Sequence, residues 1–325
     1  MKRTVKIISV LMAATILLCS CSKSDTDAVG KEYMLVAGKS GGAYNSLGIS
    51  MAGVWDKYLG SNTNVISTTG SIQNIEMLIK GDADFGFVQS DILYYAQNGK
   101  EMYEENKQKG ISVVANLYSE AVQIIVNAGT DIQTVSDLLG KTVAVGKYGT
   151  ATEAAARQIL EAYGITYDMI TVKYQTFSEA SESLASGGVD AIFAVSALPS
   201  SNISIYAETH SIRFLPVSTS GSGAKLRKSC PFFTDGVIKS EAYGTENSVA
   251  TVCIDVMLVC RSDLSSDAVY SVVSSLFNNL DELSAAHSKG AEINADTSKA
   301  TKVGSMHAGA KKYYNGLSAT GEGEE

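Results

Sequence analysis

Four short polar turns carry the residues whose chemistry is most readily interpreted. Each turn follows an apolar, strand-like run and precedes an amphipathic helix, in the segments LVAGKSGGAYNSLG, VISTTGSIQNIEMLI, FGFVQSDILYY and VAVGKYGTATEAAARQIL, which begin at residues 35, 65, 85 and 143. The first N–H groups of a helix are unpaired and lie at the positive end of its dipole, so they attract anions. The turns therefore predict capture of a small carboxylate, with no chemistry performed on it.

The elements around these turns must bring them together. Runs of strand length alternate with helix-spaced apolar patterns along most of the 325 residues, which predicts an α/β fold of two domains. In a parallel sheet the carboxyl ends of the strands share one edge, and ligands bind in the crevice at that edge. We therefore expect the four turns to converge on one cleft.

Side chains that could support catalysis are not spaced for it. His210, His287 and His307 lie far apart and match no metal-binding pattern such as HExxH, and no GxSxG nucleophile motif is present. The Gly-rich fragment Gly221–Gly223 lacks the lysine pattern of a phosphate-binding loop. We therefore expect no enzymatic activity, no metal site and no cofactor.

The N-terminus has the pattern of a bacterial export signal. Three basic residues precede the apolar run Ile7–Leu18, which is too short to span a bilayer comfortably. The sequence LCSC, which ends at Cys21, resembles a lipobox and predicts lipidation of Cys21. Lipid chains on Cys21 would anchor the protein outside the cytoplasm, in a periplasm or on an outer cell surface. An ordinary cleaved signal with incidental cysteines is the alternative.

The mature chain is expected to be acidic. The whole sequence has a net charge of −8, and loss of residues 1–20 removes three basic residues and no acidic one, which leaves about −11. This charge argues against nucleic acid as a partner and requires any anion selectivity to be local. Cys230, Cys253 and Cys260 remain after Cys21, and their odd number leaves at least one free thiol. The last two flank an apolar run and are expected to be buried.

Two crossings are expected to join the domains. The strands Ile111–Asn116 and Val122–Val126 flank the polar pair Ser119–Glu120, where the chain is expected to enter the second domain. The strand Val249–Arg261 is the expected return crossing, and Asp267–His287 is the longest predicted helix. The predicted division is residues 1–20 signal, 21–30 tether, 31–121 with 256–317 first domain, 122–255 second domain, and 318–325 disordered tail.

Three residues in these elements have competing interpretations. Trp55 lies about three helical turns from the first polar turn, so we expect it in the core. Ser71 and Ser90 open helices, where their hydroxyl groups can either cap the helix or contact a ligand. Both roles use the same oxygen atom, so they compete.

Several motifs in fixed order resemble the TAXI family of solute-binding proteins of TRAP transporters. They are SGGAYNSLG, STTGSIQNIEMLIKGDADFGFVQSD, LYSEAVQIIV, SEASESLASGGVDAIFAVSALP and LVCRSDLSSDAVYSVVSSLFNNLDELSAAH, and the resemblance runs from about residue 33 to residue 317. It implies the type II periplasmic-binding-protein fold, with two α/β domains joined by two hinge crossings. It also implies capture of glutamate, glutamine, 2-oxoglutarate or a related dicarboxylate and delivery to a TRAP membrane subunit driven by an ion gradient.

The resemblance also implies which residues line the cleft. These are, from the four turns and the strand end near residue 196, Ser40, Gly41, Gly42, Ala43, Tyr44, Thr69, Gly70, Ser71, Asn74, Gln89, Ser90, Asp91, Gly149, Thr150, Thr152, Ala194, Ser196 and Leu198.

The fourth turn departs from the family pattern G-S-G-T-E, because this chain has Lys147-Tyr148-Gly149-Thr150-Ala151-Thr152-Glu153 there. Lys147 adds a cation beside a helix N-terminus, where it could meet a ligand carboxylate or remain a solvated surface lysine. Lys147 is therefore a further candidate site residue. Ala151 in place of glycine removes room for close approach of the backbone to a ligand, which weakens the implied ligand identity.

The expected mechanism is closure of the two domains about hinges near Ser119–Gln123 and Val249–Ile254, driven by contacts that the ligand makes to both domains. We expect the protein to be a monomer. A receptor for an ABC transporter, or a sensor lipoprotein feeding a signalling protein, remains an alternative. An enzyme on the same fold is a further alternative.

Overall fold

The computed structural model describes residues 30–320. The predicted export signal, Cys21 and nearly all of the tether lie outside these residues, as does the end of the tail after residue 320. Within the described range, no helix is both long and apolar enough to cross a membrane. Also within that range, no three His, Cys, Asp or Glu side chains gather as a metal site would require.

A mixed sheet of ten strands runs through the molecule in the order β2-β1-β3-β10-β4-β7-β5-β6, with β8 beside β4 and β9 beside β10. The strands are β1 Glu32–Val36, β2 Asn62–Ile66, β3 Phe85–Gln89, β4 Ile111–Asn127, β5 Thr142–Ala144, β6 Thr171–Lys173, β7 Ala191–Ser196, β8 Ile212–Phe214, β9 Phe233–Ile238 and β10 Val249–Arg261. The helices are α1 Ala43–Leu59, α2 Ser71–Lys80, α3 Ser90–Asn98, α4 Ala151–Ala162, α5 Phe177–Ala185, α6 Ser201–Ala207, α7 Ala224–Ser229, α8 Ser266–Phe277, α9 Leu280–Ala286, α10 Ala295–Ser298 and α11 Ala308–Thr320.

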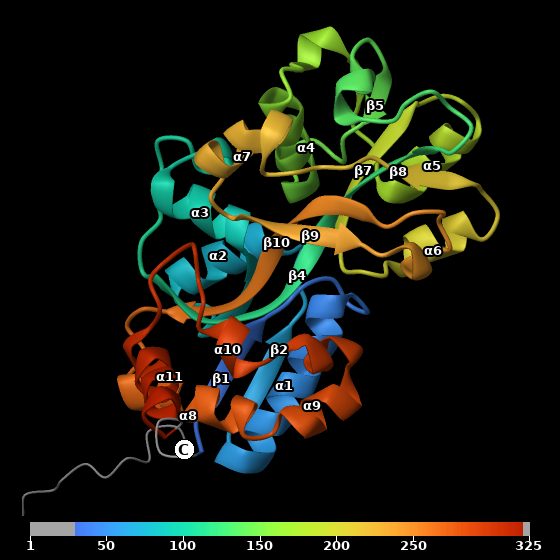
Figure 1. Ribbon diagram of the computed structural model, residues 1–325. Helices are drawn as coiled ribbons and strands as arrows, with labels where there is room; N and C mark the ends of the chain where they lie inside the picture. The colour runs from blue at the N-terminus through green and yellow to red at the C-terminus, as the bar shows by residue number, and fades with distance from the viewer. Residues whose placement is uncertain (1–29, 321–325) are drawn as a thin grey trace, which may run out of the picture.

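Two lobes share this sheet. Strands β2, β1 and β3 are parallel and belong to the first lobe, and β7, β5 and β6 are parallel and belong to the second. The long antiparallel strands β4 and β10 run from one lobe into the other (Figure 1). The α/β fold with two crossings is therefore as predicted.

Strand β4 differs from its prediction. It is one strand of 17 residues, not two strands broken at Ser119–Glu120. Both polar side chains have partners within the fold, because the Ser119 hydroxyl donates to Asp255 Oδ1 at 2.7 Å and the Glu120 carboxylate accepts a hydrogen bond from Gln89. Pairing with β10 continues through the segment, and the register shifts only further along β10, between Val256 and Met257 and between Leu258 and Val259. This polar pair within an apolar run therefore does not end the strand, because both side chains have hydrogen-bond partners in the fold.

The hydrophobic core is arranged differently on the two faces of the sheet. On one face a single cluster spans both lobes, with Ile75 and Ile92 from α2 and α3 and Ile159 and Leu226 from α4 and α7. On the other face the clusters are separate, one under α1, α8 and α11 and one under α5 and α6. Trp55 is fully buried in the first of these, as predicted. The break between the two clusters leaves room for a cleft on this face.

The predicted helix Asp267–His287 is interrupted. Helix α8 ends at Phe277 and α9 begins at Leu280. The side chains of the intervening residues bond back to the preceding turn, with Asn278 Nδ2 donating to Ser274 Oγ at 3.2 Å and Asn279 Nδ2 to the Ser275 carbonyl at 2.7 Å. Asparagine competes with the helical backbone in this way, which favours a helix end. Helix α1, with 17 residues, is longer than either piece.

Two further predictions have clear outcomes. Helix α11 continues to Thr320, so the predicted disordered tail begins too early at residue 318. Cys230, Cys253 and Cys260 are free and buried. This confirms the prediction that Cys253 and Cys260 are buried.

Candidate functional site

The first turn joins β1 to α1 and is partly open to solvent. Gly41 has a φ of +75°, which favours glycine, and the Gly42 N–H closes the turn on the Lys39 carbonyl at 2.9 Å. Gly42 is the N-cap of α1 and has no side chain to occupy the helix end. Ser40, Gly41 and Ala43 are exposed. The free end of α1 is therefore available to a ligand.

Asn74 fixes the second turn against the first and third. Its Nδ2 donates to the carbonyls of Ala37 and Phe87, at 2.5 and 2.7 Å, and its Oδ1 accepts from the Thr68 hydroxyl at 2.6 Å. The side chain is fully buried, so its hydrogen-bonding capacity is used within the protein. Asn74 thus ties together the ends of β1, β2 and β3. Thr69 and Gly70 form the rest of this turn, and the Thr69 N–H donates a hydrogen bond to the Gln73 side chain.

Ser71 and Ser90 do not cap their helices. The N-caps are Gly70 and Gln89, and neither provides a side-chain cap. Ser71 Oγ accepts from the Gln89 N–H at 3.1 Å, and Ser90 Oγ accepts from the Asp255 N–H at 3.2 Å. The capping interpretation is therefore wrong, because these hydroxyl groups join helix starts to neighbouring strands.

A cavity of about 320 Å³ lies between the first turn and the second lobe. Lys39 lines this cavity from the first lobe. The fourth turn contributes Lys147 and Thr150, and Thr150 also caps α4 by accepting from the Glu153 N–H at 3.4 Å. The remaining walls come from β7 and the starts of α5 and α6. The structure thus brings the first and fourth turns to one cleft.

The predicted site residues are distributed unevenly around this cleft. Those that line the cavity are Lys147, Thr150, Thr152, Ala194 and Ser196. Gly149 lines a separate hollow beside Tyr148, and Leu198 lines another between the lobes. Lining residues that the sequence did not indicate include Lys39, Gln175, Thr176 and Asn202. Lys39 belongs to the first Gly-rich turn, where its side chain was passed over, and the other three lie in segments of ordinary polar composition that carry no distinctive signal.

A buried carboxylate stands where the first and third turns meet β4. Glu120 is 8% exposed, and its Oε2 accepts from Gln89 Nε2 at 2.6 Å. The Tyr44 hydroxyl also hydrogen-bonds to it, and the Tyr44 ring stacks on Phe87 at 5.6 Å between centroids. Burial raises the pKa of Glu120 to about 7, although the bond from Gln89 opposes the shift. The signal in the sequence is a lone acid within the apolar run LYSEAVQIIV.

Asp91 is a second carboxylate in the same region. It lies in the first turn of α3 and is fully buried. Its Oδ1 accepts from the Ile92 N–H at 2.7 Å, and its Oδ2 has no hydrogen-bond partner within residues 30–320. Burial raises the pKa of Asp91 to about 7, and the charge of Glu120 adds to this shift. Gln89, Asp91 and Tyr44 thus surround Glu120 from three elements.

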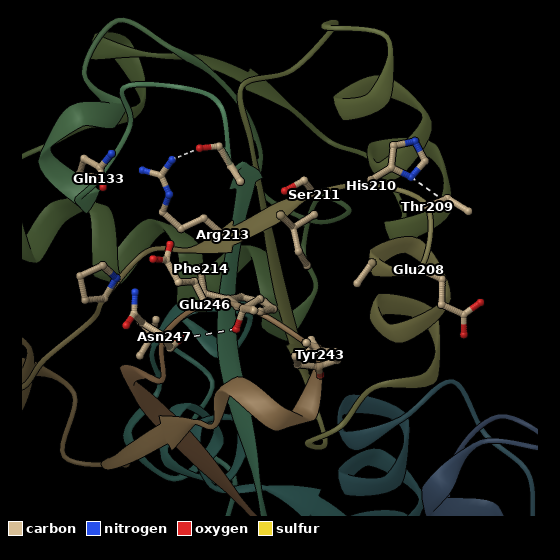
Figure 2. A pocket seen from close by; sticks show the side chains of 17 residues that line it. Gln133, Glu208, Thr209, His210, Ser211, Arg213, Phe214, Tyr243, Glu246 and Asn247 are labelled. Atoms are coloured by element: carbon tan, nitrogen blue, oxygen red, sulfur yellow. Dashed lines mark hydrogen bonds between the residues drawn. The ribbon is translucent and has the colours of Figure 1, made fainter.

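A larger hollow, of about 850 Å³, lies in the second lobe beside β8 (Figure 2). Arg213 is its most conspicuous cation, but the guanidinium donates to the carbonyls of Ala128, Thr130 and Ile132 and holds that loop. His210 bonds to Thr209 at the opposite wall, away from Arg213 (Figure 2). This hollow is therefore less suited to a small anion than the cleft between the lobes.

Known proteins place the chain by fold and by family. The TctC solute-binding protein from Polaromonas superposes with a TM-score of 0.52 at 15% identity, over 89% of this chain and 94% of that chain. A putative sulfonate ABC transporter component, the periplasmic sulfonate-binding protein SsuA from Methylobacillus flagellatus, gives 0.51 at 13% identity, over 90% and 88%. The periplasmic-binding-protein fold is therefore shared. A model of the NMT1-like family matches residues 35–316, and the chain belongs to that family.

Proposed function

We propose that this chain is an extracytoplasmic solute-binding lipoprotein, anchored through Cys21, that captures a small carboxylate and delivers it to a TRAP transporter. The observation that carries the proposal is the cavity that Lys39 of the first lobe shares with Lys147 and Thr150 of the second. A ligand held there contacts both lobes at once. Such contacts are what a closing motion needs, because only differential affinity shifts the equilibrium between open and closed forms.

Three kinds of group would bind the carboxylate. The uncapped N-terminus of α1 offers backbone N–H groups and the positive end of the helix dipole. Lys39 and Lys147 add two cations in a chain that is otherwise acidic. Hydroxyl groups of Thr150, Thr152 and other cavity residues can fix the orientation of the ligand. In this proposal the polar turns act as a receptor, and no side chain is a nucleophile or a general base.

The lobes are proposed to pivot about β4 and β10, with residues 31–121 and 256–317 in one body and 122–255 in the other. On the face opposite the cleft the bodies are in contact, because Arg157 of α4 pairs with Glu101 and Gln158 Nε2 donates to the Tyr95 hydroxyl at 2.5 Å. Closure must therefore either rotate about this contact or break it.

Isothermal titration calorimetry on the purified full-length chain tests the proposal. The panel contains dicarboxylates, 2-oxo acids, amino acids and an alkanesulfonate, and we expect at least one carboxylate to bind with a Kd well below about 1 mM. The proposed function is refuted if no carboxylate in the panel has a Kd below about 1 mM. Tight binding of the sulfonate alone would favour the ABC-receptor alternative. Co-purification with a TRAP membrane subunit or with an ABC permease encoded beside this chain then decides the transporter class.

A further inference from the structure

A cavity of about 520 Å³ lies beside β4 and β10, the two strands that join the lobes. We call it the crossing cavity. Its wall includes residues 116–119 of β4 and Cys253 and Asp255 of β10. Leu198, just after β7, lines it from the second lobe, and residues between 289 and 302 line it from the first. The crossing cavity shares no lining residue with the cavity proposed for the carboxylate, so it is a separate place in the fold.

Asn116 has a hydrogen-bonding atom that the fold does not use. The residue lines the crossing cavity and is 9% exposed, and its Nδ2 donates to the carbonyl of Ala300, which lines the same cavity. The Ser298 hydroxyl donates at 2.6 Å to the Asn116 backbone carbonyl and not to its side chain. Within residues 30–320, the buried Asn116 Oδ1 has no hydrogen-bond partner. Such an atom requires an explanation, and in a cavity wall it can accept from a ligand.

Tyr118 repeats this arrangement two residues further along β4. It also lines the crossing cavity, is 5% exposed, and has a hydroxyl group without a hydrogen-bond partner among the described residues. Lys289 lies over its ring, 5.4 Å from the centroid, so the ring itself is packed in place. A phenol hydroxyl group can both donate and accept. Strand β4 therefore presents an amide oxygen and a hydroxyl group that are both available to a ligand.

The charges around the crossing cavity balance one another. Two acidic and two basic side chains line it, and they are Asp255, Glu292, Lys289 and Lys302. Lys289 pairs with Glu292 and donates to the Leu198 carbonyl at 3.2 Å. Burial raises the pKa of the Asp255 carboxyl group, whereas the hydrogen bond from Ser119 and the charge of Lys302 oppose the shift. A charged ligand would lack a counter-charge of its own here, so the wall favours a neutral molecule.

The apolar part of the wall narrows the ligand further. Leu117, Leu198 and Val237 line the crossing cavity, and Val237, which is 53% exposed, lies at its mouth. An apolar wall with a few placed polar groups suits a molecule that combines a hydrocarbon face with hydroxyl groups.

We propose that the crossing cavity is a second ligand site, which binds a monosaccharide or a cyclic polyol through Asn116 and Tyr118. A ligand hydroxyl group can donate to Asn116 Oδ1, and a second one can donate to or accept from the Tyr118 hydroxyl. The C–H face of the ring packs on the leucines, and no charge has to be compensated. Because both crossings line the site, its ligand lies beside the strands about which the lobes are proposed to pivot.

NMR titration of the full-length chain with D-glucose, D-galactose, N-acetyl-D-glucosamine and myo-inositol tests the site. We expect at least one of them to bind with a Kd below about 1 mM. Tyr118→Phe should weaken that binding about fivefold, the effect of one neutral hydrogen bond. It should leave the Tm of the ligand-free protein within about 1 °C, because the hydroxyl group has no partner in the fold. Tyr206→Phe is the matched control, since this buried tyrosine of α6 also has a hydroxyl group without a partner among the described residues.

A second variant closes the mouth of the cavity. Val237→Trp adds bulk at an exposed position and should abolish binding, whereas Ile205→Trp, at a position that is 64% exposed on α6, should not change it. If Tyr118→Phe does not fold, as circular dichroism would show, this pair decides. Loss of binding in Val237→Trp alone supports the inference, and unchanged binding overturns it.

Three other results would overturn the inference. One is a panel in which no member binds below about 1 mM. Another is an equal affinity of Tyr118→Phe and the wild type, or an equal loss in Tyr206→Phe. The third is loss of binding in Lys147→Met, which would place the polyol in the carboxylate cavity. Failure of the carboxylate panel leaves the inference standing, because the two cavities share no lining residue.

Discussion

Glu120→Gln should stabilise the ligand-free protein at alkaline pH. The variant removes a buried charge but retains an oxygen that can accept the hydrogen bonds from Gln89 and Tyr44. In the folded state the carboxyl group, with its raised pKa, holds its proton up to about pH 7, whereas in the unfolded chain it loses the proton near its ordinary pKa of 4.5. Between these values the folded state binds more protons, so wild-type stability falls as the pH rises.

The size of the effect follows from the two pKa values. The penalty carried by wild-type Glu120 is about 3 kcal/mol at pH 8 and about 1 kcal/mol at pH 5. Glutamine carries no such penalty, so the gain in the free energy of unfolding should be about 2 kcal/mol larger at pH 8 than at pH 5. For a chain of this size the corresponding rise in Tm at pH 8 is roughly 5 °C. Asp91 should also ionise more readily in the variant, because Glu120 raises its pKa.

Differential scanning calorimetry and urea denaturation of the ligand-free protein at both pH values measure this difference. Glu182→Gln, which removes an exposed charge, should change the Tm by no more than about 1 °C at either pH. A Glu120→Gln variant that is equally stabilised or equally destabilised at pH 5 and pH 8 would refute the reasoning. Such a result would mean that folding does not raise the pKa of Glu120, because its charge is compensated in the folded chain.

Two other substitutions test the turns themselves. Asn74→Ala should lower the free energy of unfolding by about 3 kcal/mol, because buried partners of three hydrogen bonds are left unsatisfied, whereas Asn98→Ala on the surface should cost under about 1 kcal/mol in the same urea denaturation experiment. A small effect at Asn74 would mean that the strand ends are held by other contacts. Lys147→Met should weaken carboxylate binding about tenfold in calorimetry, with exposed Lys109→Met unchanged, and an unaltered Kd would identify Lys147 as a solvated surface residue.

Local patterns in the sequence determined the alternating strands and helices of the fold. Alternating strand and helix periods, with glycine at positions such as Gly41, identify the turns because backbone conformation there depends on neighbouring residues alone. The burial of Trp55 follows from helical spacing in the same way. The motifs together also indicated the periplasmic-binding-protein fold.

Tertiary contacts decided what local pattern could not. The sequence predicted a break at Ser119–Glu120, yet β4 continues because Asp255 and Gln89, distant along the chain, supply partners for both side chains. Ser71 and Ser90 look like helix caps, but their oxygens accept from neighbouring strands. Each of these outcomes depends on a partner that no local window contains.

The same distinction applies to the candidate site. The sequence by itself determined the four turns, and with them the expectation of an anion at free helix ends. Only the folded sheet placed Lys39 opposite Lys147 across a cavity and enclosed Glu120 and Asp91 away from water. The sequence shows that a residue is acidic. Its pKa and its need for a counter-ion depend on how far the surrounding strands exclude solvent from it.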